Sequence, residues 1–164
     1  MAYSDDVPSK AAIDGHPIHP MLISFPIASL SLALLSDVIF WTNQDGFWAQ
    51  VSVWLLLVGV LTGLAAAVFG LIDFVSIQRI RDLSISWIHA GGNVVAMVLA
   101  LINLLLRLNE PAEAVLPWGL ILSVVTGLIL VITGWLGGEM SYRHRIGVNS
   151  EGSEHRSSAP QAGD

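Results

Sequence analysis

Four long apolar stretches alternate with short polar connections along the chain. The stretches cover residues 20–41, 47–77, 85–108 and 116–140. Each one reaches the roughly 20 residues that an α-helix needs to cross the hydrocarbon core of a bilayer. Because the connections between them are short, neighbouring helices are expected to pack antiparallel. The pattern therefore predicts an all-α fold, a four-helix transmembrane bundle.

Polar segments flank this bundle at both ends of the chain. Residues 1–13 are predicted to be an N-terminal tail, and they lack the basic start of a secretory signal peptide. Residues 149–164 are rich in Ser, Gly and Glu and are predicted to be a disordered C-terminal tail. Residues 14–148 are predicted to form one transmembrane domain between the two tails.

Basic residues are distributed unevenly between the two sides of the predicted bundle. Six of the seven lysines and arginines fall on the side of the two termini. They are Lys10, Arg79, Arg81, Arg143, Arg145 and Arg156. The positive-inside rule places that side, with both termini, in the cytoplasm. The seventh, Arg107, lies near the outer side, where a salt bridge to Asp37 is expected to lower the cost of charge in the membrane.

Composition supports a membrane protein and excludes several classes of function. Hydrophobic residues make up 54% of the chain and charged residues only 12%, whereas about 25% of a typical soluble domain is charged. The formal net charge of −6 argues against binding of nucleic acid, which needs a basic surface. The chain has no cysteine, which excludes disulfides, thiolate metal sites and cysteine-held iron–sulfur clusters.

The six tryptophans fall into two groups. Those near the ends of the predicted spans are expected at the membrane–water interfaces; they are Trp41, Trp48, Trp87 and Trp118. Trp54 and Trp135 lie within spans and are expected to pack against neighbouring helices.

Spaced motifs indicate an internal duplication. At an offset of 64 residues, a T-G-L motif, a glycine and an R-x-R motif recur; at an offset of 70, a histidine and a charged position recur. The matched positions are 62–64 with 126–128, Gly70 with Gly134, Arg79 with Arg143, His19 with His89, and Asp37 with Arg107. Two spans per repeat give both halves the same orientation in the membrane. The sequence therefore predicts two repeated helical hairpins, with His19 and His89 level and facing each other.

Four histidines are predicted at the cytoplasmic ends of the spans. His16 and His19 precede the first span, His89 opens the third, and His144 follows the fourth. The two prolines of the G-H-P-I-H-P motif favour an extended, polyproline-like segment, whose three-residue repeat points His16 and His19 the same way. At the start of a helix the dipole disfavours imidazolium, and neutral imidazole is the form that binds a metal.

Glycines and arginines near these histidines complete the predicted site. Paired glycines clear backbone space in which a flat, bulky group fits; the pairs are Gly91 with Gly92 and Gly137 with Gly138. If the flat group is a haem, Arg79 and Arg143 are expected to bind its propionate groups at the cytoplasmic end of the bundle.

Two motifs resemble a known family. At residues 15–26 (GHPIHPMLISFP) and 134–148 (GWLGGEMSYRHRIGV), the chain resembles the bacterial membrane family catalogued as domain of unknown function 2231. The resemblance covers residues 14–148. It implies four transmembrane helices in the bacterial cytoplasmic (inner) membrane. Some similar proteins carry a Rieske-type iron–sulfur domain, which implies redox surroundings and favours a haem.

Three functions are compatible with these residues. The first is a b-type haem protein that transfers electrons, with His19 and His89 as axial ligands. The second is a site for a divalent zinc, iron or copper ion, with ligands from His16, His19, His89 and His144. The third is a cofactor-free accessory subunit, scaffold or minimal transporter. A haem protein would exchange electrons with a partner protein or a quinone, and a scaffold would form homo-oligomers; no catalytic triad or carboxylate pair indicates an enzyme.

Overall fold

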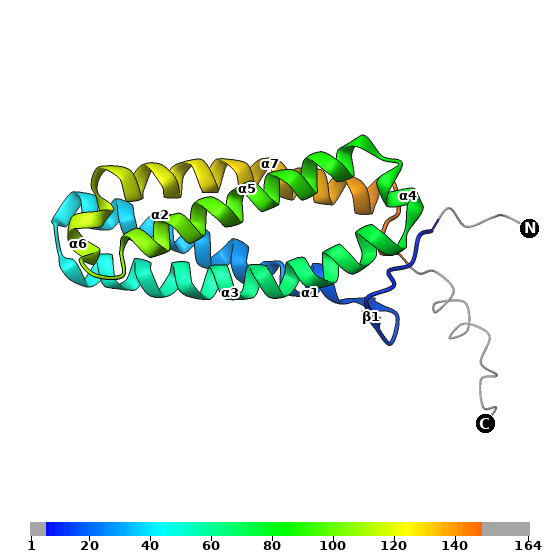
Figure 1. Ribbon diagram of the computed structural model, residues 1–164, viewed down its shortest axis with the longest axis horizontal. Coiled ribbons are helices and arrows are strands. Elements are labelled where there is room, and N and C mark those ends of the chain that lie inside the picture. Colours follow the sequence, from blue (N-terminus) through cyan, green and yellow to red (C-terminus); the bar gives the residue numbers. More distant parts are fainter. Residues whose placement is uncertain (1–5, 149–164) are drawn as a thin grey trace, which may run out of the picture.

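The chain folds as a bundle of two helical hairpins (Figure 1). The structure is a computed structural model, and it describes residues 6–148. Helices α2 (Ser24–Asn43) and α3 (Gly46–Ser76) form the first hairpin. Helices α5 (Ser84–Leu106) and α7 (Leu120–Tyr142) form the second. Because α2 also packs on α7, and α3 on α5, helix α2 lies diagonally opposite α5.

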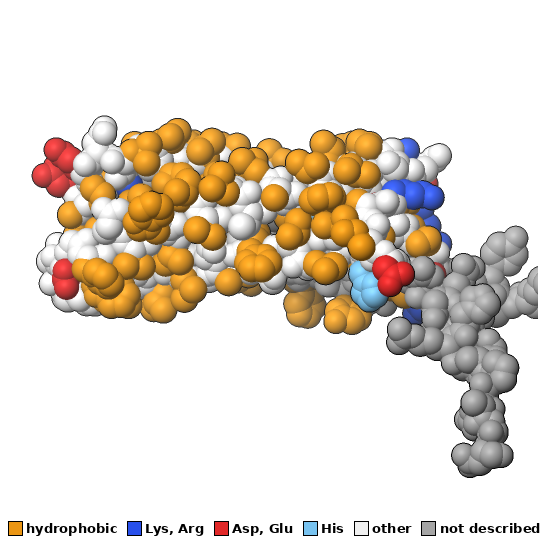
Figure 2. All heavy atoms as spheres, turned by 90° about the horizontal axis from the view of Figure 1, so that it is seen from below, with side chains coloured by type: hydrophobic (Ala, Val, Ile, Leu, Met, Phe, Trp, Pro, Cys, Tyr) orange, Lys and Arg blue, Asp and Glu red, His pale blue; other side chains and the backbone are white. Residues whose placement is uncertain are grey.

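Four helical segments are long and apolar enough to cross a membrane, in agreement with the four predicted spans. They are Ile18–Asn43, Gly46–Ser76, Ser84–Leu106 and Pro111–Tyr142. Figure 2 shows apolar side chains along the length of the bundle, with charged side chains gathered at its two ends. This distribution matches the apolar core and polar surfaces of a bilayer.

The inside of the bundle is filled by small residues, whereas large apolar side chains point outward. Ala33, Ala96 and Ala100 have no exposed surface, while Val131 is 73% exposed. A core of larger side chains packs among the small ones; its buried members are Leu30, Leu56, Val60 and Leu104. Membrane helices associate in this way because small residues let the backbones approach closely, while lipid solvates the outer aliphatic side chains.

A two-residue connection closes the first hairpin. The turn after α2 passes through Gln44, which has a left-handed backbone (φ 56°). Asp45 then caps α3, because its carboxylate accepts a hydrogen bond of 3.0 Å from the Phe47 amide. This local satisfaction of helix-end amides explains why the chain reverses here within two residues.

Several boundaries differ from those predicted. The first span starts as α1 (Ile18–Leu22) and continues as α2. The third ends at Leu106, because Arg107 turns into the bundle and is fully buried. The fourth begins with two short helices, α6 (Pro111–Ala114) and η1 (Val115–Gly119), and the non-helical backbone of Leu116 interrupts it before α7. Between the hairpins lies the short helix α4 (Gln78–Arg81).

The segment before the first span is more structured than the sequence suggests. Strands β1 (Ala12–Ile13) and β2 (His16–Pro17) pair antiparallel. Helix α1 follows directly, so the prediction of one extended segment through His16 and His19 is wrong: the two histidines lie in different elements. The segment is anchored at Asp73 of α3, whose carboxylate accepts hydrogen bonds of 2.6, 2.7 and 3.0 Å from the Ser9 hydroxyl and the amides of the next two residues.

The two described chain ends lie together at one end of the bundle, beside α4 (Figure 1). The Val7 amide donates to the Arg145 carbonyl at 3.1 Å, and Asp6 forms an ion pair with Arg145. Val7 is buried beside Ile77 and Ile80. The predicted disordered tail, 149–164, lies outside the described residues.

Candidate functional site

His19 of α1 and His89 of α5 face each other inside the bundle. Their ring centres are 6.4 Å apart and the ring planes are nearly perpendicular, at 84°. Both side chains are partly buried. Since α1 leads into α2, the two rings come from diagonally opposite helices. The structure therefore brings together the two histidines that the sequence matches at an offset of 70.

Each imidazole is held by a backbone carbonyl of the helix beside it. Nδ1 of His19 lies 2.9 Å from the carbonyl oxygen of Ala66 on α3, and Nδ1 of His89 lies 2.8 Å from that of Thr133 on α7. A carbonyl can only accept, so each Nδ1 carries the proton and donates it. This leaves Nε2 of each ring as the nitrogen whose lone pair would bind a metal.

Two glycines make room for the rings. A Cβ atom built on Gly70 of α3 would lie 2.9 Å from His19 Nδ1, and one on Gly137 of α7 would lie 3.1 Å from His89 Cε1. A side chain at either position would require the imidazole to shift. Gly70 and Gly137 therefore act as seats for the two rings.

Asn93 and Thr133 add polar contacts around His89. The Asn93 amide nitrogen lies 3.2 Å from His89 Nε2 and donates to the His89 carbonyl at 2.9 Å. The Thr133 hydroxyl donates to the Asn93 amide oxygen at 3.0 Å, which fixes the orientation of the amide. Asn93 therefore donates to the Nε2 lone pair of His89.

A buried hydroxyl lies one turn before His89. Ser86 is 1% exposed, and its Oγ has no hydrogen-bond partner among residues 6–148. A buried hydroxyl without a partner is costly, so such a group in a native protein usually indicates a water molecule or a ligand atom nearby.

The other predicted site residues lie away from this pair. His16 is exposed, and its Nδ1 contacts the Asp14 carbonyl at 2.9 Å in the β1–β2 turn. His144 follows α7, and its amide donates to the Glu139 carbonyl. Over residues 6–148, no three His, Asp or Glu side chains are grouped so that they could hold a metal ion.

The predicted arginines and the remaining predicted glycines make no contact with the two imidazoles among the contacts found for residues 6–148. Arg79 is exposed, and Arg143 forms an ion pair of 2.7 Å with Glu139. Gly92 allows close packing of α5 on α7, since an added Cβ would lie 2.6 Å from Thr133. An added Cβ on Gly91 would have no neighbour within 4 Å, and one on Gly138 would meet only Tyr142, at 4.0 Å.

The bundle contains a second polar cluster, around the buried pair of Asp37 and Arg107. The guanidinium binds the carboxylate through both terminal nitrogens, at 2.5 and 2.9 Å, and both side chains are fully buried. The predicted salt bridge is therefore confirmed. The guanidinium of Arg107 also donates to Asn103 at 2.8 Å, to Ser52 at 2.7 Å and to Ser123 at 3.5 Å.

This cluster connects all four long helices, which supply Asp37 from α2, Ser52 from α3, Asn103 from α5 and Ser123 from α7. The five N–H groups of an arginine are matched by the five hydrogen bonds that Arg107 donates. A fully paired charge of this kind is tolerated in a low-dielectric interior, where an unpaired one is not.

Several residues of the histidine site were not predicted from the sequence. The carbonyls of Ala66 and Thr133 carry no side-chain signal, because any residue supplies a carbonyl. Asn93, by contrast, could have been found from the sequence, because an amide four residues after His89 lies on the same face of a helix and is unusual in an apolar span.

Replacing Gly137 with alanine is expected to destabilise the protein by about 1–3 kcal/mol, because the new methyl group would overpack the His89 ring. The matched control is Gly134→Ala on the same helix, where an added Cβ has no neighbour within 4 Å. That change is expected to stabilise by roughly 0.5–1 kcal/mol through helix propensity. Denaturant unfolding in detergent micelles, followed by circular dichroism, measures both; equal effects of the two changes would show that Gly137 is not a seat.

Comparison with known proteins agrees with the membrane architecture. The sequence pattern of a family described as predicted membrane protein (DUF2231) matches residues 15–150. No curated protein and no solved structure matches the chain. The matched region contains all four spans and both imidazoles of the pair.

Proposed function

This chain belongs to the DUF2231 family of predicted membrane proteins, and we propose that it is a small bacterial inner-membrane protein that binds b-type haem for electron transfer. His19 and His89 would be its two axial ligands. The observation that carries the proposal is the imidazole pair, with ring centres 6.4 Å apart and both Nδ1 atoms hydrogen-bonded to carbonyls.

The distance between the rings fits two ligands on opposite sides of one metal. A metal–imidazole bond is about 2.0–2.1 Å long and a ring nitrogen lies about 1.1 Å from the ring centre, so trans ligands put the ring centres about 6.3 Å apart. Tetrahedral ligands would bring them to about 5 Å. The separation of 6.4 Å between the ring centres is closer to the first value, so His19 and His89 would be able to hold a haem iron between them.

The residues around the pair would hold the rings and tune their basicity. The carbonyls of Ala66 and Thr133 fix the tautomer and orientation of His19 and His89 and raise the basicity of Nε2. Gly70 and Gly137 keep the rings against those carbonyls. Asn93 donates to the Nε2 atom that a metal would take, so its amide must move aside when the group binds.

A haem supplies a reversible one-electron couple between ferric and ferrous iron when it is bound. The unpartnered Ser86 hydroxyl, one turn from His89, offers a donor to one of its carboxylates. Arg79, which is exposed, would bind the other. Arg143 would have to exchange its contact with Glu139 for such a role.

The proposal includes the duplication and the orientation predicted from the sequence. The two matched pairs at offset 70, His19 with His89 and Asp37 with Arg107, both meet across the bundle, which supports two fused hairpins. With the arginine-rich end in the cytoplasm, the imidazole pair would lie near the cytoplasmic surface, because α4 and both described chain ends are at that end (Figure 1).

An absorption spectrum of the detergent-purified full chain, expressed with a haem precursor, tests the proposal. We expect a Soret band that shifts and sharpens on reduction with dithionite, as for two axial imidazoles. His16→Ala is the discriminating variant: it should leave the spectrum unchanged, because His16 contacts Asp14 and not the pair. A colourless protein with stoichiometric zinc, iron or copper that loses the metal in the His16 variant would instead support the metal-ion function, and a colourless, metal-free protein would exclude both.

A further inference from the structure

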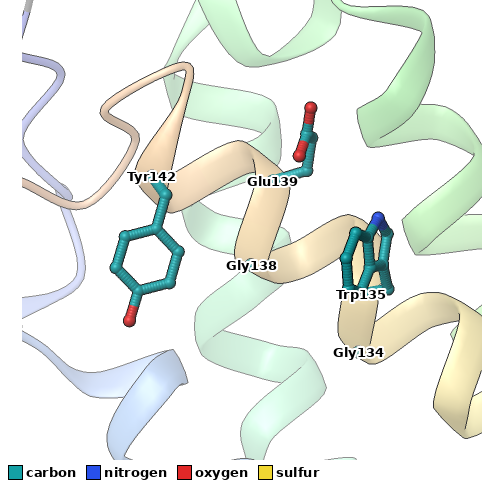
Figure 3. A pocket seen from close by; sticks show the side chains of 5 residues that line it. All are labelled: Gly134, Trp135, Gly138, Glu139 and Tyr142. Carbon is teal, nitrogen blue, oxygen red and sulfur yellow. The ribbon is translucent and has the colours of Figure 1, made fainter.

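A hollow on the outer face of α7 was not predicted from the sequence. It has a volume of about 290 Å³ and is lined by Gly134, Trp135, Gly138, Glu139 and Tyr142. Figure 3 shows Trp135 and Tyr142 on either side of Gly138. We call these five residues the α7 notch.

The glycines of the notch do not serve packing within the chain. A Cβ atom on Gly134 would have no neighbour within 4 Å, and one on Gly138 would meet only Tyr142, at 4.0 Å. By contrast, an added Cβ on Gly59, Gly63 or Gly92 would lie 2.6 Å from a side chain of another helix. The two notch glycines therefore open space toward the outside of the bundle.

Two aromatic side chains form the walls of the notch. Trp135 is 77% and Tyr142 is 89% exposed, so the prediction that Trp135 packs against a neighbouring helix is wrong. The same prediction is wrong for Trp54, which is 61% exposed. Seven residues separate them, which corresponds to about 10 Å along a helix axis. Both side chains line the notch, so a flat ring that enters it would contact aromatic surface on either side.

The rim of the notch is polar on one side and apolar on the other. Glu139 and Arg143 form an ion pair of 2.7 Å there, and the Arg143 side chain is 77% exposed. A guanidinium donates hydrogen bonds, and a carboxylate accepts them. Toward the middle of α7 the exposed side chains are aliphatic: Leu128, Val131 and Ile132 are 61%, 73% and 58% exposed.

We propose that the α7 notch binds a quinone, with its ring between Trp135 and Tyr142 and its aliphatic tail along α7 toward the bilayer centre. A quinone carbonyl oxygen accepts from the Arg143 guanidinium, and a hydroxyl of the reduced form donates to Glu139. A second copy of the chain fits the notch less well, because two bulky aromatic side chains would hold a partner helix away from the glycines.

The notch adjoins the imidazole pair through one turn of α7. Gly138 is in the floor of the notch, while its neighbour Gly137 faces the His89 ring on the inside of the bundle. The inference rests on the proposed function in naming a quinone as the membrane-soluble partner of the haem, whereas binding of the quinone itself needs no haem.

Equilibrium binding of decylubiquinone to the full chain in phospholipid nanodiscs tests the inference, with empty nanodiscs as the measure of partition into lipid. We expect saturable binding in excess of empty nanodiscs. Gly138→Leu fills the floor and Trp135→Leu removes a wall, and each should weaken binding by at least about tenfold. Ala65→Leu and Trp54→Leu, at exposed positions of α3, are the matched controls and should change it less than about twofold.

Three results would overturn the inference. The first is binding no greater than to empty nanodiscs, and the second is equal binding by the Gly138→Leu and Ala65→Leu variants when both keep the circular dichroism of the parent. The third is loss of a dimer or of a co-purified phospholipid in Gly138→Leu without a change in quinone binding. The His19→Ala/His89→Ala variant separates the two proposals, because it should lose haem yet bind decylubiquinone as the parent does.

Discussion

Replacing Arg107 with leucine is expected to lower the free energy of unfolding by about 3–5 kcal/mol, because it leaves Asp37 as an unpaired buried charge. The pair is fully buried, and the guanidinium donates hydrogen bonds to acceptors from all four long helices. Unfolding of the protein in mixed micelles with increasing SDS, followed by circular dichroism, measures the loss.

Two further variants show whether the unpaired charge is the cause. Asp37→Leu combined with Arg107→Leu removes both charges, and the double variant should be more stable than Arg107→Leu alone, since a buried pair can be replaced by apolar residues at little cost. Arg79→Leu, at an exposed position, should change stability by less than about 0.5 kcal/mol. If the double variant lost as much stability as Arg107→Leu and Asp37→Leu lose separately when their losses are added, the pair would contribute no coupling and the explanation would be wrong.

Replacing His19 and His89 together with alanine is expected to abolish haem retention, because both axial ligands of the proposed site are lost. Each single variant should keep one ligand and retain less haem than the parent, with an altered Soret band. Added imidazole should restore the parent spectrum in the single variants, since the truncated side chain leaves space where the ring lay. Haem content per protein, measured after purification, is the readout.

The control for this experiment is His155→Ala, in the part of the chain outside the described residues. It should retain haem like the parent, because that histidine belongs to the predicted C-terminal tail. Equal retention by the double variant and the parent would remove His19 and His89 from the ligand set. Loss of haem in every variant, including His155→Ala, would show that the assay reports expression rather than ligation.

Sequence reasoning predicted the arrangement of spans better than their ends. The four apolar stretches appear as four long helices, because length and hydropathy are local properties. The ends moved by up to several residues: Arg107 turns inward to reach Asp37, and Leu116 interrupts the start of the fourth span. These changes depend on contacts between distant segments, which no local pattern contains.

The same distinction holds for individual tryptophans and glycines. Trp135 lies inside an apolar span, so a role in packing was expected, yet it is exposed beside the α7 notch. Gly137 and Gly138 are adjacent in the sequence, but one seats the His89 ring and the other opens outward. Neighbouring helical positions differ by about 100° around the axis, and only the packing of α7 decides which of them faces inward.

The sequence by itself determined that this chain has four stretches long and apolar enough to span a membrane, that it has no cysteine, and that His19 with His89 and Asp37 with Arg107 recur at an offset of 70 residues. Hydropathy, composition and spacing are sufficient for these conclusions because each is a property of the chain alone. Only the tertiary structure decided which carbonyls hold the two imidazoles, that 6.4 Å separates their centres, and that His16 lies apart from them. Those facts arise from the packing of diagonally opposed helices, which fixes side-chain distances between residues far apart in the chain.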